Sequence, residues 1–318
     1  MVRGLVIKST GSSYIVRMDD GSDAECHIKG NFRIRGIRST NPVAVGDYVQ
    51  VQSQPNGTNW ITDIEDRRNY IIRRATNLSK ESHILAANID QAALIVTLKH
   101  PVTNLTFIDR FLATCEAYRV PAILLFNKAD LATEEDILER FIIIEMYSDL
   151  GYRTLSISAK QMLTENIPPD KHDPHNTLRK LLEGKTTLLS GNSGVGKSTL
   201  LNALLGQEVA RTGEISDVHN TGKHTTTFSE MYFLPQGGAV IDTPGIKGFG
   251  AINFEREEVS HFFREIFQTS CNCRYYNCTH TNEPGCAVIE AVEKGKIRMS
   301  RYESYLSLLG DCTESKYR

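Results

Sequence analysis

The chain has 318 residues, of which 40% are hydrophobic and 23% are charged, and its formal net charge is −2. This charge excludes a global positive field that would draw the protein to nucleic acid, so such binding must come from local basic patches. The longest apolar runs, such as residues 92–98, are too short to span a bilayer, and residues 1–16 form no signal-peptide block. We expect a cytoplasmic protein with two or three domains and no membrane association.

Residues 2–65 alternate in short strand-like runs that are separated by turn signals. Five such runs in so short a segment predict a five-stranded OB-fold β-barrel over residues 1–70. One connecting segment is basic around an aromatic side chain, which suits contacts with RNA, although a solvated loop with one buried phenylalanine fits the composition equally well. The residues concerned are Lys29, Phe32, Arg33, Arg35 and Arg38.

From residue 87, apolar runs of strand length alternate with amphipathic segments, two of which predict helices over residues 108–118 and 134–150. This alternation is typical of an α/β domain with a mostly parallel sheet, which we assign to residues 71–253. Beyond residue 254 the pattern becomes helical and is interrupted by cysteines and a histidine. Residues 254–318 are therefore predicted to form a third, helical domain.

The segment NKAD, residues 127–130, follows the apolar run PAILLF. A carboxylate can accept hydrogen bonds from both N1–H and the exocyclic amine of guanine, so Asp130 is predicted to read that base. We place Asn127 toward guanine O6 and the stem of Lys128 against the ring. The segment ISAK, at the end of the next run, offers the Ala159 amide to the guanine oxygen. Two further residues of that segment, Ser158 and Lys160, complete the predicted base site.

The segment GNSGVGKS, residues 191–198, lies between a strand-like run and a helix-like run. Its glycines let backbone N–H groups turn toward phosphates, and the following helix presents its N-terminus to the anion. Lys197 is predicted to contact the β- and γ-phosphates, and the Ser198 hydroxyl is predicted to bind Mg²⁺. The predicted phosphate loop contains Gly191, Asn192, Ser193, Gly194, Val195, Gly196, Lys197, Ser198 and Thr199.

The segment DTPG, residues 242–245, ends another apolar run. Asp242 is predicted to hold Mg²⁺ through water, and the Gly245 amide to sense the γ-phosphate. Every one of these motifs lies at the carboxyl end of a predicted strand, where parallel α/β sheets bind ligands. The base-reading segment nevertheless precedes the phosphate loop. A cyclic rotation of the chain explains this order, because it moves the termini and leaves the sheet intact.

The pattern C-x4-C-x-H-x5-C near the C-terminus predicts a structural zinc site. Three thiolates and an imidazole complete a tetrahedral set with no open position for catalysis. The ligands are Cys273, Cys278, His280 and Cys286, with Cys271 as an alternative to Cys273. The isolated cysteines Cys26, Cys115 and Cys312 are predicted to be packing residues.

The last helical segments carry cations between apolar positions at helical spacing. We predict a packed helix with a charged outer face, and a contact with RNA is the alternative. The cations are Lys294, Lys296, Arg298 and Arg301.

The order NKAD, SAK, GNSGVGKS, HTTT and DTPG, with a barrel before it and a Cys/His cluster after it, resembles the RsgA (YjeQ/YloQ) family over essentially the whole chain. This resemblance implies an OB-fold, a circularly permuted P-loop GTPase domain and a C-terminal zinc-binding domain. It also implies GTP hydrolysis that the 30S subunit stimulates during late maturation of that particle. The implied partners are the 30S subunit, its 16S rRNA and GTP/GDP, and the implied cofactors are one structural Zn²⁺ and Mg²⁺ with GTP. The family pattern selects Cys273 over Cys271.

The resemblance further places a switch segment at GKHTTT, residues 222–227, where one threonine would complete the Mg²⁺ shell. We take Thr226 for this role, while Thr225 and Thr227 remain open. Ile246 stands where Ras-type GTPases have a water-orienting glutamine, and an apolar side chain cannot orient water. We therefore expect slow intrinsic hydrolysis and name His224 as a catalytic group beside Lys197 and Thr226. The alternative is that His224 is a solvated loop residue.

Two rival functions follow from the same motifs. A permuted GTPase of large-subunit assembly is disfavoured by the barrel and the Cys/His cluster. An RNA-binding module with a structural nucleotide site is disfavoured because Lys197, Ser198 and Asp242 retain the residues of Mg²⁺ chemistry. No segment signals a stable oligomer, so we expect a monomer.

Overall fold

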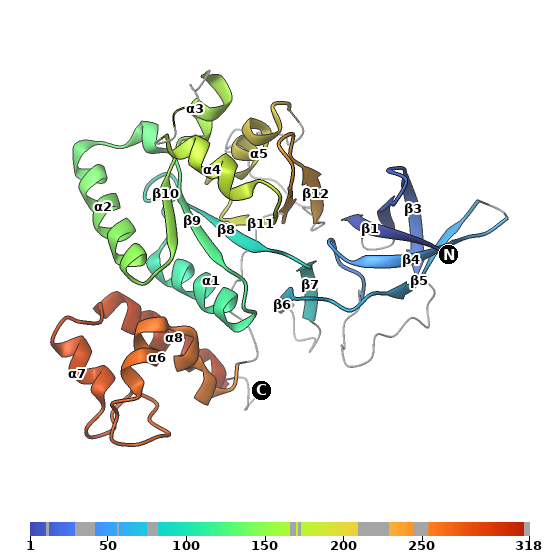
Figure 1. The fold of residues 1–318 in the computed structure, drawn as a ribbon. Helices are drawn as coiled ribbons and strands as arrows, with labels where there is room; N and C mark the ends of the chain where they lie inside the picture. The colour runs from blue at the N-terminus through green and yellow to red at the C-terminus, as the bar shows by residue number, and fades with distance from the viewer. Residues whose placement is uncertain are drawn as a thin grey trace, which may run out of the picture.

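The computed structural model describes residues 1–10, 13–28, 42–55, 57–74, 82–165, 170, 173–208, 229–243 and 254–314. The basic segment 29–38, the predicted switch segment 222–227 and Gly245 lie outside these residues. The described chain forms an N-terminal barrel, a central α/β unit and a C-terminal group of helices (Figure 1).

The N-terminal barrel contains β1 (Val2–Ser9), β2 (Tyr14–Met18), β3 (Asp23–Ile28), β4 (Tyr48–Ser53) and β5 (Asn59–Ile64). The strand order β1-β2-β3-β5-β4 closes on itself because β1 also pairs with β4. Alternate side chains of these strands point inward and form a separate apolar core, which includes Val6, Val16, Val49 and Ile61. The predicted five-stranded barrel is therefore confirmed.

Two strands that the sequence analysis did not predict follow the barrel. They are β6 (Tyr70–Arg74) and β7 (Ser82–Ala87), which pair with each other as a small antiparallel sheet. Gly46 of the barrel approaches β7 so closely that a Cβ there would lie 2.1 Å from the Ala87 carbonyl oxygen. The Arg67 guanidinium also donates to both oxygens of the buried Asp47 carboxylate. These contacts hold the barrel against the start of the central unit.

The central sheet contains β8 (Gln91–Val96), β9 (Ala122–Phe126), β10 (Arg153–Ser156), β11 (Thr186–Gly191), β12 (Glu230–Phe233) and β13 (Ala239–Asp242). Its order is β10-β9-β8-β11-β13-β12, and all pairs are parallel except β12 with β13. The strand before the phosphate loop, β11, thus lies between β8 and β13 although it comes late in the chain. The mostly parallel α/β sheet is confirmed.

Helices cover both faces of this sheet (Figure 1). They are α1 (Leu105–Ala117), the 3₁₀ helix η1 (Ala129–Leu131), α2 (Glu134–Asp149), α3 (Ala159–Thr164), α4 (Pro174–Leu182) and α5 (Lys197–Leu205). Alternate residues of β8 feed two separate apolar cores, with Leu94 in one and Ile95 in the other. Strands buried on both faces explain the unbroken apolar runs in the sequence.

The barrel and the central sheet are hydrogen-bonded to each other. Lys8 of β1 pairs in register with Glu230 of β12, and their side chains form an ion pair of 3.0 Å. The guanidinium of Arg17 lies over the ring of Phe233, 4.5 Å from its centroid. The two units therefore share one continuous sheet through the edge strand β12.

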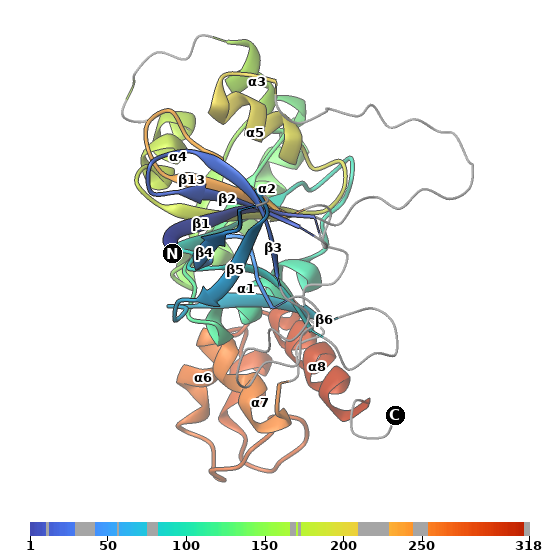
Figure 2. The ribbon, with the colours of Figure 1, turned by 90° about the vertical axis from the view of Figure 1, so that its right-hand side faces the viewer.

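The C-terminal helices are η2 (Arg256–Phe262), α6 (Arg264–Ser270), α7 (Ala287–Glu293) and α8 (Met299–Glu314), and they pack against α1 (Figure 2). Three arginines cross this interface. Arg264 donates to Glu116 and stacks on Tyr152, and Arg110 pairs with Asp311. Within the described residues, no helix combines the length and the apolar character that crossing a membrane requires.

The third arginine corrects the predicted charged outer face of the last helix. Lys294, Lys296 and Arg298 are exposed, but the Arg301 side chain is 1% exposed. Its guanidinium donates to Asp109 at 2.7 Å and to Glu265 at 2.6 Å. The prediction was wrong for Arg301 because Asp109 lies 192 residues away in the sequence, so no local pattern indicates that the two residues pair.

Replacing Arg301 should therefore destabilise the protein strongly. Arg301→Met leaves the fully buried Asp109 without its cation, and we expect the free energy of unfolding to fall by about 3–5 kcal/mol. Arg110→Met is the control, because its ion pair with Asp311 is partly exposed and should contribute about 0–1 kcal/mol. Urea denaturation followed by circular dichroism measures both; equal losses would contradict this assignment.

Candidate functional site

The phosphate loop connects β11 to α5 and requires glycine at several positions. Gly194 and Gly196 have φ of 81° and 98°, which L side chains rarely adopt. A Cβ at Gly196 would lie 2.4 Å from Asn127 Nδ2, and one at Gly191 would lie 2.9 Å from the Ile95 carbonyl oxygen. The loop therefore passes over β8 and the base-reading segment at a distance that no side chain permits.

Lys197 and Asp242 carry opposite charges beside this loop and attract each other. The Lys197 ammonium donates to the Gly191 carbonyl at 2.8 Å, and burial lowers its pKa. Burial raises the pKa of Asp242, although Lys197 opposes this shift. Within the described residues, the buried Asp242 Oδ1 has no hydrogen-bond partner. A buried acceptor of this kind fits the predicted role of holding water on Mg²⁺, and the bound cation would oppose the rise in the pKa of Asp242 that burial causes.

The amide of Asn127 links three loops. Its Nδ2 donates to the Val195 carbonyl in the phosphate loop, and its Oδ1 accepts from the Ala159 backbone N–H, both at 2.8 Å. Asn127 is 3% exposed, so these bonds are protected from water. In the structure, Asn127 holds the loops together. Its contact with guanine O6 stays a prediction.

Asp130 lies on η1 with its carboxylate exposed to solvent. The Ser158 hydroxyl donates to Asp130 Oδ1 at 2.6 Å, so the two segments predicted to read the base are in direct contact. The Ser158 backbone N–H in turn donates to His175 Nε2 at 3.1 Å. Sequence analysis missed His175, which follows the helix-capping pair Asp173 and Pro174; that pair predicts the start of a helix and no role in the site.

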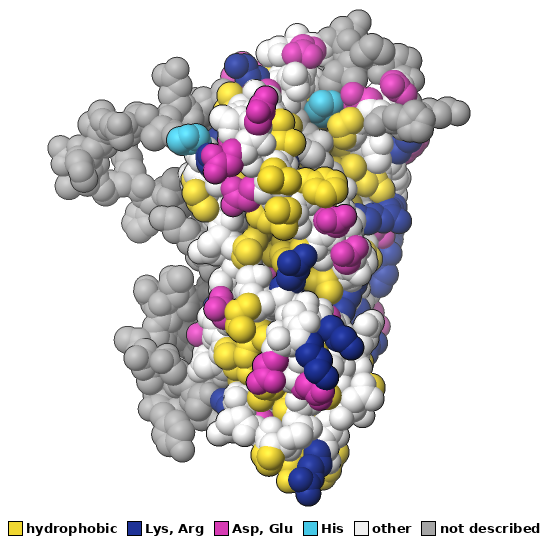
Figure 3. All heavy atoms as spheres, turned by 90° about the vertical axis from the view of Figure 1, so that its left-hand side faces the viewer, with side chains coloured by type: hydrophobic (Ala, Val, Ile, Leu, Met, Phe, Trp, Pro, Cys, Tyr) yellow, Lys and Arg dark blue, Asp and Glu magenta, His cyan; other side chains and the backbone are white. Residues whose placement is uncertain are grey.

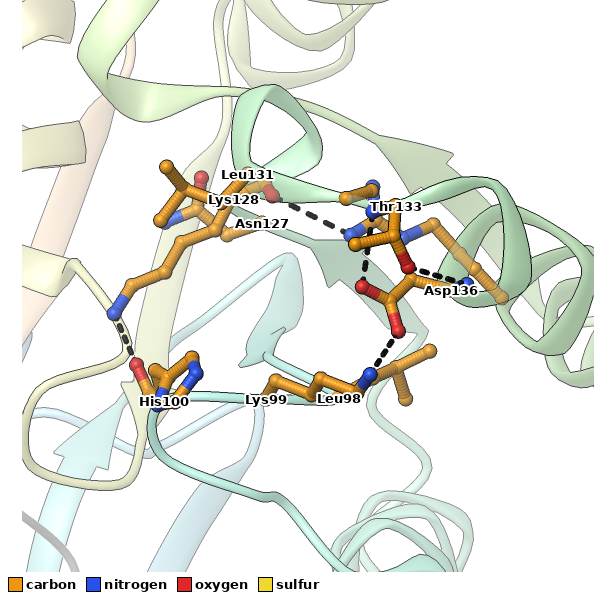
Figure 4. A pocket seen from close by; sticks show the side chains of 10 residues that line it. Leu98, Lys99, His100, Asn127, Lys128, Leu131, Thr133 and Asp136 are labelled. Carbon is orange, nitrogen blue, oxygen red and sulfur yellow. Dashed lines mark hydrogen bonds and ion pairs between the residues drawn. The ribbon is translucent and has the colours of Figure 1, made fainter.

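Lys128 closes one side of a cavity of about 210 Å³ behind the base-reading segment (Figure 4). Its backbone has a positive φ of 60°, and its ammonium donates to the His100 carbonyl. On the other side, Asp136 accepts from the Thr133 N–H and pairs with Lys99, which lowers the pKa of Asp136 to about 2. Residues 98–100, which carried no motif, therefore support the base-reading segment.

The four predicted zinc ligands lie together in the segment between α6 and α7. The ligand atoms of Cys273, Cys278, His280 and Cys286 are all within 4.8 Å of one another. The Cys273 and Cys286 sulfurs are 3.9 Å apart. Zn–S bonds of about 2.3 Å in a tetrahedron give edges of about 3.8 Å, so this set fits zinc. Cys271 is exposed and donates to the Gln268 carbonyl, outside the cluster.

Hydrogen bonds from neighbouring side chains fix the shape of the segment that carries these four residues. His280 has a positive φ of 57°, and its carbonyl accepts from the Tyr302 hydroxyl at 2.6 Å. The Tyr305 hydroxyl donates to the Thr279 carbonyl, also at 2.6 Å. The Glu283 carboxylate accepts from the Thr279 and Thr281 backbone N–H groups. Helix α8 and one acidic side chain thus hold the ligand-bearing turn from both sides.

Several predicted site residues lie outside the described residues. These are Thr225, Thr226, Thr227 and His224 in the switch segment, with Gly245 and Ile246 after DTPG. Their roles stay predictions.

Comparisons with known proteins agree with this arrangement. The family model described as RsgA GTPase matches residues 64–252, and that described as RsgA N-terminal domain matches residues 3–61. "Small ribosomal subunit biogenesis GTPase RsgA" of Phocaeicola vulgatus is 59% identical over 100% of this chain and 99% of its own length. The protein of the same name from Porphyromonas gingivalis is 55% identical over 99% of this chain and 98% of its own.

Two solved structures have the same overall fold. YjeQ from Thermotoga maritima is 30% identical, covers 98% of both chains and gives a TM-score of 0.73. YloQ, described as a circularly permuted GTPase, is 28% identical, covers 100% of this chain and 97% of its own, and gives a TM-score of 0.70. The late position of the phosphate loop in this chain agrees with the circular permutation stated for YloQ.

Gly196→Ala should weaken GTP binding by about tenfold or more, because the new Cβ displaces Asn127 and with it the phosphate loop. Gly206→Ala is the matched control: its φ of 68° imposes similar backbone strain, but nothing lies within 4 Å of the added Cβ. Titration with a fluorescent GTP analogue measures both affinities. Similar losses in the two variants would show that backbone strain, and not the contact with Asn127, determines the effect.

Proposed function

Because this chain belongs to the RsgA GTPase family, we propose that it hydrolyses GTP in the biogenesis of the small ribosomal subunit. The observation that carries this proposal is the full-length similarity to relatives named for that role. The joined base-reading and phosphate loops supply the chemistry that the role requires. Binding to the 30S subunit is proposed to activate hydrolysis during late maturation.

The phosphate loop residues bind and orient the triphosphate. Backbone N–H groups of the loop and the N-terminus of α5 attract the phosphates, and Lys197 exchanges its bond to the Gly191 carbonyl for the β- and γ-phosphates. Ser198 and Asp242 would hold Mg²⁺ with Thr226. Mg²⁺, when bound, neutralises charge that develops on the phosphates.

Base specificity is proposed to come from Asp130 and Ala159. The Asp130 carboxylate would accept from guanine N1–H and the exocyclic amine, and adenine offers no matching donors. The Ala159 N–H donates to Asn127, and this contact with the segment that contains Asp130 supports the proposal. GTP is therefore preferred over ATP.

Water activation is proposed to depend on the switch segments. Ile246 cannot orient the attacking water, so hydrolysis by the free protein is expected to be slow. His224, beside the switch threonines, is proposed to take part when the ribosomal subunit binds.

We further propose a metal ion for the C-terminal cluster and partners for the protein. Cys273, Cys278, His280 and Cys286 are proposed to hold one structural Zn²⁺, since their separations fit a tetrahedron and they form a closed set. The basic segment 29–38 is proposed to contact 16S rRNA. The protein is proposed to act as a cytoplasmic monomer.

Hydrolysis assays test the proposed function. GTP and ATP turnover are measured for the purified chain alone, with 30S subunits and with 50S subunits. We expect slow GTP turnover alone and at least about tenfold faster turnover with 30S subunits only, which corresponds to about 1.4 kcal/mol of barrier. Equal stimulation by both subunits would favour the large-subunit alternative, and no stimulation would favour the binding module.

The same assay tests His224. His224→Ala should retain GTP binding and lose most of the 30S-stimulated turnover. Full stimulated turnover in this variant would remove His224 from the mechanism and leave the proposed function intact.

Metal analysis tests the zinc proposal. Cys286→Ser should lose the bound zinc, because one of four ligands is removed, whereas Cys271→Ser should keep one zinc per chain. Mass spectrometry of the metal content after dialysis measures both. Loss of zinc in the Cys271 variant would show that Cys271 is a zinc ligand.

A further inference from the structure

Helix α2 carries a continuous row of exposed hydrophobic side chains. Ile137, Leu138, Phe141 and Ile142 are 58%, 63%, 58% and 47% exposed. Positions three and four apart are neighbours on a helix surface, so these four form one patch along two turns. We call it the α2 patch. Figure 3 shows this side of the molecule, with hydrophobic side chains gathered in its upper half.

The fold itself does not require the α2 patch. The opposite face of the helix already packs on the sheet through buried residues such as Arg140 and Tyr147. Polar residues with strong helix propensity would serve on an outer face equally well. Single exposed apolar residues are common, but a contiguous group marks an interaction surface.

The exposed charges of α2 itself are acidic, and one half-exposed cation, Lys99, pairs with Asp136 beside them. The only cation of α2, Arg140, is buried, whereas its exposed charged side chains are all acidic. The acidic residues are Glu134, Glu135, Glu139, Glu145 and Asp149. Such a rim repels phosphates, so it opposes contact with RNA and attracts a partner that carries lysine and arginine.

We propose that the α2 patch docks a basic protein segment whose apolar side chains lie between lysines and arginines. The proposal rests on the proposed function in one respect, because it assigns that segment to a protein of the small ribosomal subunit. A second copy of this chain is a poorer occupant, since a two-fold contact would place acidic rim against acidic rim. RNA is a poorer occupant as well, because the five exposed acidic side chains of α2 outnumber the nearby Lys99.

Charge reversal gives the sharpest test, because a basic protein partner and an RNA partner predict opposite changes in affinity for 30S subunits. The variant Glu135→Lys/Glu139→Lys and the unchanged chain are titrated with purified 30S subunits in low and high salt. A basic protein segment predicts at least about fivefold weaker binding in low salt, with a smaller difference in high salt. Tighter binding by the variant would indicate RNA and overturn the proposal.

Removing the central aromatic tests the apolar contact. Phe141→Ser should weaken 30S binding by about tenfold, as expected for a central interface aromatic. Phe267→Ser is the matched control, because Phe267 is 51% exposed on α6, away from the patch, and its loss should change binding less than about twofold. Melting temperature and GTP turnover without ribosomes should be unchanged in the Phe141 variant. Equal binding by the two variants would overturn the proposal.

Crosslinking identifies the occupant. A photoreactive phenylalanine at position 138 of the full chain, irradiated on 30S subunits, should crosslink to a lysine- or arginine-rich protein segment. A crosslink to rRNA, or to a second copy of the chain, would overturn the proposal. If the unchanged chain failed to bind 30S subunits, the proposed function would fall together with this partner. If it bound and the variants bound equally well, only the docking surface would fall.

Discussion

The Asn127 amide donates to Val195 and accepts from the Ala159 backbone, and these two bonds span 68 and 32 residues of sequence. They connect the end of β9, the phosphate loop and the loop before α3, which together form the candidate nucleotide site. Because the amide is buried, its bonds do not compete with water, and removing it would leave two backbone groups unsatisfied. The relative position of the predicted base and phosphate sites thus depends on one side chain, and that side chain leaves no room for a Cβ at Gly196.

The order of the motifs along the chain does not affect how the loops meet in space. Each loop follows a strand of one parallel sheet, and the sheet aligns their carboxyl ends whatever the connections between them. Rotation of the chain changes which elements lead into neighbouring domains. The barrel joins at β12, directly after the predicted switch segment, and the C-terminal helices follow the DTPG segment. Both added domains are therefore attached next to the segments expected to respond to GTP.

Local patterns predicted the barrel, the α/β sheet, the loops and the four clustered ligands, because each depends on residues close in sequence. The residues that these local patterns missed have partners that are distant in the sequence. His175 enters the base site by bonding to Ser158, and residues 98–100 enter it through Lys128, yet neither carries a motif. Arg301 was assigned to an exposed face because cations usually are exposed, and only the fold brings Asp109 to it.

The Arg301 network also determines how the C-terminal helices sit on the central unit. One guanidinium bonds Asp109 of α1 and Glu265 of α6, and the Tyr147 hydroxyl of α2 donates to the same Asp109. Desolvation offsets much of the attraction in such a buried group, so its main effect is on orientation: a shift of one turn would leave buried charges unpaired. The helices therefore cannot slide along α1. Asp242 of β13 and Phe254 of the C-terminal core are therefore held in fixed positions relative to each other.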